Sequence, residues 1–499
     1  MAIRIVSALA AAVLAMAAAS AGAQSSPPQV KIASGMLSGV RDGDVVAFKG
    51  VPFAAPPVGD LRWRPPQPAA PWSGVRAADK VGAVCAQAYN AKDNGVGPQP
   101  VSEDCLTLNV FAPAGAKAAP VMVWIHGGGF VNGSGTAALY DGAGLARQGV
   151  VVVTLNYRLG RFGFFAHPAL TKAASGEPVG NYGLMDMIAA LHWVKANISR
   201  FGGDPGQVTI FGESAGGIAV DDLMISPAAR GLFVRAIVES GLGREPAPPL
   251  AEAEKAGEAF ATKVGLANAT AADLRKLSTE QILVAGDPDL RAGGGSMRDG
   301  QILTLGPMEA FAQGVEAKVP YLVGWNSLEF PAPAAVRDKF LETAAPAEKR
   351  SQLAAAYRDP DSYGAHIVSD LLFTEPALSL ARLHAAHGQP TWVYQFSVLS
   401  PAERSTLQGA PHASERQYVF KTLKTSPWPT DANDAVQSDA MSAYWTAFAR
   451  TGDPNGSGRV RWPAYDTSRD ELLDFTNSGP VAVKTPRPSA MDAITALYR

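Results

Sequence analysis

The chain has 499 residues, of which 47% are hydrophobic and 18% are charged, so it can bury a large core and is not intrinsically disordered. Its 43 basic and 45 acidic residues leave a formal net charge of −2, and the basic residues form no stripe or tail. A nucleic acid is therefore not expected as a partner.

The N-terminus has the pattern of an export signal. An apolar run at residues 5–19 follows Arg4, and the small residues Ala21 and Ala23 come after it. The run is shorter than the roughly 20 residues that a bilayer-spanning helix needs. The sequence therefore predicts a cleaved signal peptide at residues 1–23, a periplasmic or secreted protein, and no stable membrane anchor.

Residues 25–115 are rich in proline and glycine, most densely between Val51 and Gly59, and this predicts an irregular region with edge strands. Cys85 and Cys105 lie in it and are the only cysteines. In an oxidising compartment such a pair favours a structural disulfide over two buried thiols. The closed loop would contribute roughly 3 kcal/mol in the chain-entropy model.

From Pro120 onward, apolar runs alternate with glycine loops and helical patterns. The expected strands lie at residues 121–125, 150–155, 208–211, 319–324 and 392–396, and the expected helices lie at 184–198 and between 240 and 284. Continuous β-branched runs are typical of strands buried on both faces. The order predicts an α/β protein with a large, mostly parallel central sheet flanked by helices. No linker divides residues 24–499, so a single domain is expected.

A Gly-x-Ser-x-Gly pattern at residues 212–216 lies between a predicted strand and a predicted helix. Such a turn holds the central Ser214 in a strained backbone conformation, and the flanking glycines remove Cβ atoms that would clash. The following helix directs its positive end at the serine, so the amide of Ala215 is expected to stabilise an oxyanion. The pattern alone is weak, but its place at a strand end predicts that Ser214 is a nucleophile.

Three glycines at residues 127–129 follow the strand predicted at 121–125. Consecutive glycines allow backbone N–H groups to approach a substrate oxygen closely. We therefore expect Gly128 and Gly129 to contribute to an oxyanion hole. The alternative is a flexible turn or a phosphate-binding loop, but no Gly-Lys-Ser/Thr sequence follows.

A serine nucleophile needs a histidine base whose pKa lies near the working pH. In the α/β-hydrolase fold, where such serine turns occur, the order along the chain is Ser, acid, His. His384 and His387 end a helical stretch and are expected at the surface. His412 lies in a loop after the last predicted strand and is the predicted base, with His366 as a second choice.

Glu329 follows the strand predicted at residues 319–324 and lies between apolar neighbours. A buried carboxylate needs a partner, and the imidazolium of His412 is the natural one. The predicted acid is therefore Glu329, with a role as the cap of a following helix as the alternative.

Taken together, these motifs resemble the type B carboxylesterase family, which includes the cholinesterases and bacterial p-nitrobenzyl esterases. The matching stretches are residues 48–54, 103–110, 156–160, 201–205, 212–217, 444–449, 452–455 and 462–463. The resemblance implies an α/β-hydrolase fold with long insertions. It also implies hydrolysis of small-molecule carboxylic esters through an acyl-enzyme, with no cofactor and no metal.

The resemblance also assigns individual residues. It implies a triad of Ser214, Glu329 and His412, an oxyanion hole of Gly128, Gly129 and Ala215, and a disulfide between Cys85 and Cys105. It places Glu213 and Ser240 in a supporting position around the triad.

The chain departs from the family pattern beside the site. Leu328 and Phe330 flank the acid where Asp and Gly are usual, and Ala413 replaces a usual Gly after the histidine. These changes predict altered loop geometry and an altered pocket, for which Tyr140, Phe130, Trp325 and Phe330 are candidate lining residues.

Two questions stay open at this point. The alternative function is a non-catalytic binding protein of the same fold, although Ser214, Glu329 and His412 are all retained. An esterase could also act on lactones, thioesters, amides or lipid esters, and neither the natural substrate nor the oligomeric state follows from the sequence.

Overall fold

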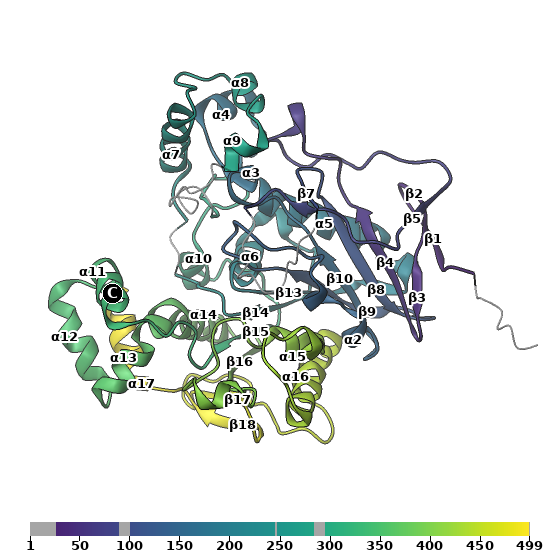
Figure 1. Cartoon of the computed structure of the whole chain (residues 1–499). Helices are drawn as coiled ribbons and strands as arrows, with labels where there is room; N and C mark the ends of the chain where they lie inside the picture. The colour runs from purple at the N-terminus through teal and green to yellow at the C-terminus, as the bar shows by residue number, and fades with distance from the viewer. Residues whose placement is uncertain (1–25, 89–99, 245–246, 284–294, 499) are drawn as a thin grey trace, which may run out of the picture.

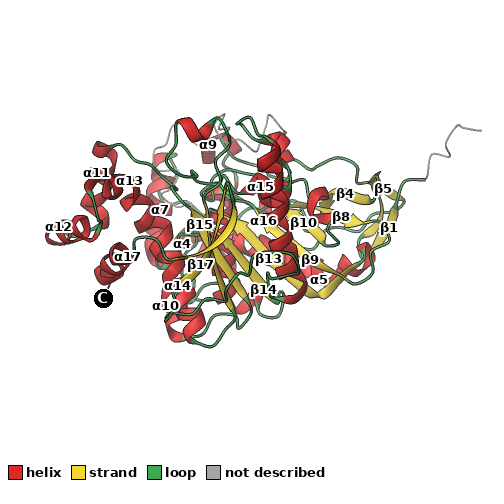
Figure 2. Cartoon of the chain, turned by 90° about the horizontal axis from the view of Figure 1, so that it is seen from below, coloured by secondary structure: helices red, strands yellow, loops and turns green. Residues whose placement is uncertain are grey.

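The computed structural model describes residues 26–88, 100–244, 247–283 and 295–498. The predicted signal peptide, residues 1–23, lies outside these described residues. A twisted 11-stranded sheet runs through the molecule, with helices on both of its faces (Figure 1, Figure 2). This is the α/β architecture that the sequence predicts.

The strand order in the main sheet is β18 (Gly479–Lys484), β17 (Glu471–Thr476), β16 (Thr391–Phe396), β15 (Tyr321–Asn326), β14 (Arg235–Glu239), β13 (Gly203–Glu213), β9 (Ala119–Ile125), β10 (Val151–Leu155), β8 (Thr107–Pro113), β4 (Val45–Pro52) and β3 (Val40–Asp42). Neighbours from β17 to β10 pair in parallel, and the strands added at each end pair antiparallel. The parallel strands therefore end along one common edge.

Smaller sheets flank the main one. They are formed by β1 (Gln29–Ile32), β2 (Gly35–Ser38) and β5 (Val75–Ala77), by β6 (Val84–Cys85) with β7 (Val101–Ser102), and by β11 (Phe164–Phe165) with β12 (Gly180–Asn181). The proline-rich region at residues 25–115 is thus only partly an edge, because β8 lies inside the main sheet between β10 and β4.

The helices connect and cover these strands. They are α2 (Ala143–Ala146), α3 (Gly160–Gly163), α4 (Pro168–Ala174), α5 (Tyr182–Asn197), α6 (Ala215–Ile225), α7 (Leu250–Lys263), α8 (Ala271–Arg275), α9 (Thr279–Leu283), α10 (Pro307–Gln313), α11 (Ala334–Ala344), α12 (Ala347–Ala356), α13 (Pro360–Ser369), α14 (Glu375–Ala386), α15 (Arg416–Phe420), α16 (Ala432–Thr451) and α17 (Pro488–Thr495). A π-helical turn, Asp370–Thr374, joins α13 to α14. The helix predicted at 184–198 corresponds to α5, and the predicted helical stretch after residue 240 divides into α7, α8 and α9.

The core lies on both sides of the sheet, as β9 shows. Val121, Val123 and Ile125 belong to one buried apolar cluster, and Met122 and Trp124 belong to a second cluster. Alternate side chains of a strand point to opposite faces, so both faces of β9 are covered. Its continuous apolar sequence follows directly from this double burial.

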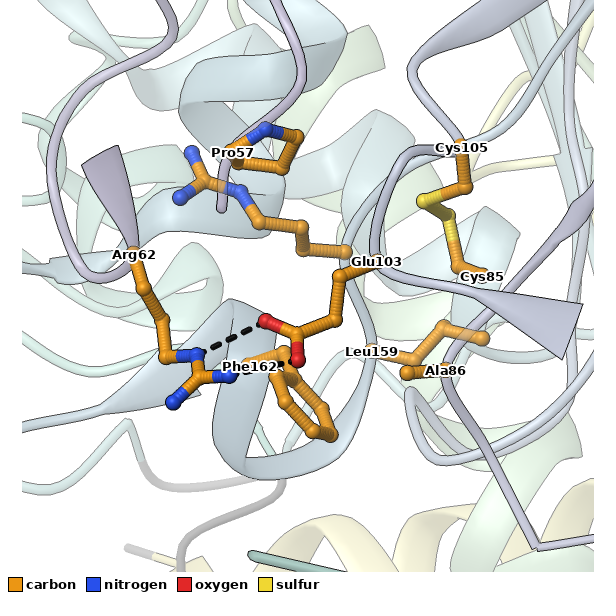
Figure 3. A pocket seen from close by; sticks show the side chains of 9 residues that line it. Pro57, Arg62, Cys85, Ala86, Glu103, Cys105, Leu159 and Phe162 are labelled. Carbon is orange, nitrogen blue, oxygen red and sulfur yellow. Dashed lines mark hydrogen bonds and ion pairs between the residues drawn. A yellow bond between two sulfur atoms is a disulfide. The ribbon is translucent and has the colours of Figure 1, made fainter. Parts of the chain in front are cut away.

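The predicted disulfide is present, with Cys85 and Cys105 joined across a sequence separation of 20 residues. Beside it, Arg62 donates two hydrogen bonds to Glu103, at 2.7 and 2.6 Å (Figure 3). A small cavity separates this ion pair from the disulfide and is closed in part by Phe162. The disulfide and the ion pair together fasten the N-terminal part of the chain.

Across the described parts of the chain, no helix is both long enough and apolar enough to cross a bilayer.

Candidate active site

Ser214 is the single residue between β13, which ends at Glu213, and α6, which begins at Ala215. Its backbone has φ 56° and ψ −122°, a conformation that residues other than glycine rarely adopt. A Cβ on Gly212 would lie 2.5 Å from the carbonyl oxygen of Gly216, and one on Gly216 would lie 2.1 Å from that of Ile125. The two glycines of the motif are therefore required by close backbone packing, as the sequence predicts.

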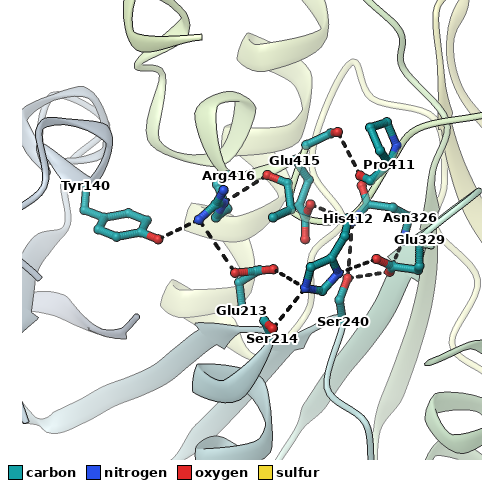
Figure 4. A network of polar contacts seen from close by, with 12 residues as sticks. Tyr140, Glu213, Ser214, Ser240, Asn326, Glu329, Pro411, His412, Glu415 and Arg416 are labelled. Atoms are coloured by element: carbon teal, nitrogen blue, oxygen red, sulfur yellow. Dashed lines mark hydrogen bonds and ion pairs between the residues drawn. The ribbon is translucent and has the colours of Figure 1, made fainter. Parts of the chain in front are cut away.

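The side chains of Ser214, His412 and Glu329 form a continuous hydrogen-bonded series (Figure 4). The Oγ of Ser214 lies 2.9 Å from Nε2 of His412, and Nδ1 of His412 lies 2.6 Å from Oε2 of Glu329. The other oxygen, Oε1, accepts bonds from the Ser240 hydroxyl and the Asn326 amide, both at 2.6 Å. Because Nδ1 donates to the carboxylate, Nε2 is left to accept the serine proton.

Two loops bring the acid and the histidine together. The backbone N–H of His412 donates to the carbonyl of Glu329, and that of Leu328 donates to Ala410, both at 3.0 Å. Glu329 is 1% exposed, and the next helix, α11, begins five residues later with Pro333 as its N-cap. The alternative that Glu329 caps a helix therefore does not hold.

The predicted oxyanion donors lie beside Ser214. A Cβ on Gly127 would lie 3.1 Å from the Cβ of Ser214, so the glycine loop packs directly against the serine. Gly128 and Gly129 follow with φ values of 109° and 61°, which glycine adopts readily. Ala215 is the first residue of α6, whose leading N–H groups have no partner within the helix.

Aromatic rings cover the imidazole. Phe330 and Phe373 lie with ring centroids 4.8 and 5.0 Å from that of His412. Phe330 is 41% exposed, whereas Trp325 and Tyr140 are buried. Of the predicted lining residues, Phe330 thus remains at the surface beside the site, and Trp325 belongs to the hydrophobic core.

A second polar layer surrounds the imidazole, and sequence reasoning found only part of it. Oε1 of Glu213 lies 3.2 Å from Nε2 of His412, and Oε2 lies 3.9 Å from Nη1 of Arg416. Arg416 donates from Nη1 to the Tyr140 hydroxyl at 3.0 Å and from Nε to the carbonyl of Ala413 at 2.9 Å. Glu213 was assigned through the family resemblance, whereas Arg416 was not predicted.

Two further buried carboxyl groups complete this layer. Glu415 accepts a hydrogen bond from Asn326 at 2.7 Å, and Glu239 accepts one from Trp445 at 2.7 Å. Burial, reinforced by neighbouring carboxylates, raises the pKa of Glu415 to about 8 and that of Glu239 well above its usual range. The buried site therefore favours protonation of both groups. No local sequence pattern marks them, because their partners are distant in the chain.

The charge state of His412 depends on its carboxylate neighbours. Burial of the ring lowers the pKa of His412, but the charges of Glu213 and then Glu329 outweigh burial and raise this pKa from 6.5 to about 9. The site therefore stabilises an imidazolium, which is the form that arises when His412 takes a proton.

The remaining histidines lie elsewhere. His384 is fully buried, with Nδ1 2.9 Å from Oε1 of Glu316 and Nε2 2.9 Å from the carbonyl of Val319, so the expectation that it lies at the surface is wrong. His387 is partly exposed, and His366 lies within α13. The histidine that contacts Ser214 is His412.

Ala413 occupies the position where the family pattern usually has glycine. Its φ is 68°, in the left-handed region that favours glycine. Its carbonyl accepts the hydrogen bond from Arg416, which fixes the turn after His412. Ala413 thus adopts a left-handed conformation in this chain although it carries a Cβ.

Comparisons with known proteins identify the family of the chain. A model of the carboxylesterase family matches residues 26–359 and 358–491. The chain is 38% identical over 467 residues to a fumonisin B1 esterase of Sphingopyxis macrogoltabida, covering 89% of this chain and 85% of that protein. It is 37% identical over 463 residues to the para-nitrobenzyl esterase of Bacillus subtilis, covering 88% and 93%.

Solved structures show the same similarity. A PNB esterase structure superposes with a TM-score of 0.84 at 34% sequence identity and covers 94% of this chain and 99% of that chain. A carboxylesterase of Geobacillus stearothermophilus superposes with a TM-score of 0.80 at 32% identity, covering 93% and 99%. The fold is therefore the α/β-hydrolase fold, and the chain belongs to the carboxylesterase family as a carboxylic ester hydrolase.

Proposed function

We propose that the protein hydrolyses carboxylic esters through an acyl-enzyme on Ser214, with His412 as the general base and Glu329 as the group that orients it. The observation that carries the proposal is the unbroken series of hydrogen bonds, 2.9 Å from Ser214 to His412 and 2.6 Å from His412 to Glu329. It has the arrangement that nucleophilic catalysis by serine requires.

Acylation begins when Oγ of Ser214 attacks the ester carbonyl carbon while Nε2 of His412 takes the hydroxyl proton. The carbonyl oxygen becomes an oxyanion, and the amides of Gly128, Gly129 and Ala215 stabilise it. His412 then gives its proton to the leaving alcohol, and the acyl group stays on the serine. In the second half of the reaction, water attacks the acyl carbon in place of the serine hydroxyl, and His412 takes the proton of the water and returns it to Ser214. The carboxylic acid is then released.

Glu329 acts on the histidine and not on the substrate. Three hydrogen bonds hold its carboxylate, from His412, Ser240 and Asn326. A carboxylate fixed in this way keeps Nδ1 protonated and the ring oriented, and it stabilises the imidazolium. Ser240 is therefore a positioning residue for the acid.

We also propose that the protein is exported and that its N-terminal 23 residues are removed, which leaves a single-domain mature chain. The disulfide supports an oxidising compartment. Expression with the native leader and intact-mass measurement of the product tests this step. A mature chain that begins at Gln24 is expected, and a full-length cytosolic product would contradict export.

The test of the catalytic proposal is hydrolysis of p-nitrophenyl esters of increasing acyl length. Ser214→Ala is compared with Ser405→Ala, which removes an exposed serine whose hydroxyl bonds only to the carbonyl of Ala402. We expect Ser214→Ala to lose kcat by a factor on the order of 10⁴ or more and Ser405→Ala to keep it. Near-native turnover by purified Ser214→Ala would contradict the proposal.

A further inference from the structure

Arg416 brings a buried positive charge into the active-site network (Figure 4). It begins α15, four residues after His412, and its side chain is only 15% exposed. The guanidinium donates hydrogen bonds to the Tyr140 hydroxyl and to the carbonyl of Ala413. Burying a charge in this way is costly unless a counter-charge is near.

The counter-charge is Glu213, which lies between Arg416 and His412 (Figure 4). One of its oxygens is 3.9 Å from the guanidinium and the other is 3.2 Å from Nε2 of His412. Nε2 is the atom that must take the proton of Ser214. The carboxylate of Glu213 therefore lies between two groups whose positive charge it can stabilise, the guanidinium and the imidazolium.

Other titratable groups surround the imidazole, and most of them are carboxyl groups. The carboxyl groups come from the ends of β13 and β14, from the loop after β15 and from the turn before α15: Glu213, Glu239, Glu329 and Glu415. Burial raises the pKa of Glu239 and Glu415, as described above. The carboxylates that raise the pKa of His412 are Glu213, Glu329 and Glu415, and the cation beside this group is Arg416.

Two tyrosines near His412, Tyr157 and Tyr394, add no charge at neutral pH. Tyr157 follows β10 and Tyr394 lies in β16, and burial raises the pKa of each well above its ordinary value. Tyr140 accepts the hydrogen bond of Arg416 from the opposite side. Burial lowers the pKa of the Arg416 guanidinium, but Tyr140 and Glu213 outweigh burial and raise it, so this charge persists.

We infer that Arg416 is a positioning residue whose buried charge offsets that of Glu213 and so disfavours protonation of His412, which extends to lower pH the range in which the imidazole can act as a base. Two carboxylates contact the imidazole, Glu213 and Glu329, and each one favours the protonated ring. A permanently protonated ring cannot accept the proton of Ser214. Arg416 opposes this tendency because its cation repels a second positive charge on His412.

The inference rests on the proposed role of His412 as the base. It differs from a structural role for Arg416 in one measurable way. A structural role through the turn at Ala413 predicts lower stability with an unchanged pH profile. An electrostatic role predicts that the pH profile follows the charge at position 416 and not its hydrogen bonds.

The experiment measures kcat/KM for p-nitrophenyl acetate from about pH 5 to about pH 10 in the wild type, Arg416→Gln and Arg416→Lys. Gln keeps a hydrogen-bond donor but removes the charge, whereas Lys keeps the charge. We expect the acid limb of Arg416→Gln to move to higher pH by about one unit, because the imidazolium loses a repelling cation. Arg416→Lys should remain closer to the wild type than to Arg416→Gln.

A folded Arg416→Gln protein whose acid limb is unchanged, or moves to lower pH, would overturn the inference. An equal shift in Arg416→Lys would overturn it as well. Circular dichroism and thermal unfolding establish that each variant is folded.

The double variant Glu213→Gln/Arg416→Gln keeps the test decisive if Arg416→Gln does not fold. Removing both members of a buried ion pair is far less destabilising than removing one. Its acid limb should lie about one unit above that of the single variant Glu213→Gln, because only the charge at position 416 differs between the two proteins. Equal acid limbs in Glu213→Gln and the double variant would contradict the inference.

A separate control distinguishes this inference from the proposed mechanism. If His412→Ala retains activity, the assignment of the base fails. If His412→Ala is inactive and the acid limb of kcat/KM does not change with the charge at position 416, only the proposed role of Arg416 is wrong.

Discussion

Two buried histidine–glutamate pairs lie at opposite ends of the same strand, β15. His412 pairs with Glu329 after the strand ends, at 2.6 Å, and His384 pairs with Glu316 before the strand begins, at 2.9 Å. Only the first pair contacts a serine hydroxyl. A buried imidazole beside a carboxylate is therefore not sufficient to make a catalytic site.

The difference lies in the second nitrogen of each ring. Nε2 of His384 faces the carbonyl oxygen of Val319, and its Nδ1 faces a carboxylate, so both nitrogens face acceptors and neither faces a hydroxyl that could give up a proton. Nε2 of His412 faces the hydroxyl of Ser214, which can donate. The first arrangement joins α14 to the start of β15, and the second can move a proton.

The position in the fold reinforces the difference. His412 lies at the carboxyl ends of the parallel strands, where the loops after β13, β14 and β15 converge. Open α/β sheets place their ligand sites at this edge. His384 lies at the opposite edge, beneath the sheet and among apolar rings such as Phe311 and Tyr321.

The largest predicted difference between the two pairs is in turnover. His412→Ala should lower kcat by a factor on the order of 10⁴, because Ser214 loses its base. His384→Ala should keep kcat within a few-fold but should lower the free energy of unfolding by about 2 to 4 kcal/mol, because it opens a cavity in the core and leaves Lys318 as the remaining side-chain hydrogen-bond partner of the buried Glu316 carboxylate. Steady-state kinetics with urea unfolding measures both. A comparable loss of kcat in both variants would remove the distinction.

The glutamates of the two pairs should show the same contrast in kcat, with a smaller loss than that of His412→Ala. Glu329→Gln should lower kcat by about 10³ to 10⁴, because a neutral amide neither fixes the tautomer of His412 nor stabilises the imidazolium. Glu316→Gln should leave kcat nearly unchanged. The matched pair is measured with one p-nitrophenyl ester at a fixed pH, and full activity in Glu329→Gln would show that the acid is another residue.

The pH dependence should sharpen the comparison further. Glu213 makes the largest upward contribution to the pKa of His412, which it helps raise to about 9. Glu213→Gln should therefore move the acid limb of kcat/KM to lower pH by about one unit, the direction opposite to that of Arg416→Gln. An unmoved limb would show that Glu213 does not act on the base.

The smallest predicted effect concerns acid stability. Burial raises the pKa of Glu316, but hydrogen bonds from His384 and Lys318 outweigh burial and lower this pKa to about 2. A lowered carboxylate pKa stabilises the fold above the unfolded value of 4.5, and this contribution disappears as the pH falls from 4.5 to about 2. The stability gap between wild type and Glu316→Gln should thus shrink on acidification. A constant gap in urea unfolding at several pH values would contradict this.

The residues of the proposed triad can be picked out from the sequence because each has a local signal. Ser214 lies in a glycine-flanked turn, and Glu329 and His412 follow strands whose apolar runs are clear. Arg416 was missed because a charged residue in a short helix is ordinarily exposed. His384 was misplaced because its position near a helix end does not reveal that Glu316, 68 residues earlier, lies against it.

The same contrast holds for the fold. The strands β9, β10 and β13 were predicted because continuous apolar runs mark strands buried on both faces. β14 was missed, since Arg235 and Glu239 at its ends interrupt a short apolar run. β8 was assigned to an irregular region because of its proline-rich surroundings, although five of its seven residues are buried. Its place in the sheet depends on pairing with β4 and β10, which is not a local property.

Covalent trapping of the nucleophile tests the central claim most directly. The wild type and Ser214→Ala are treated with a serine-directed organophosphonate, and intact mass and peptide mapping locate the adduct. The account predicts one adduct per chain, on the peptide that contains Ser214, with loss of esterase activity in proportion to labelling and no adduct in Ser214→Ala. An adduct on another residue with full loss of activity, or stoichiometric labelling of Ser214→Ala, would contradict it.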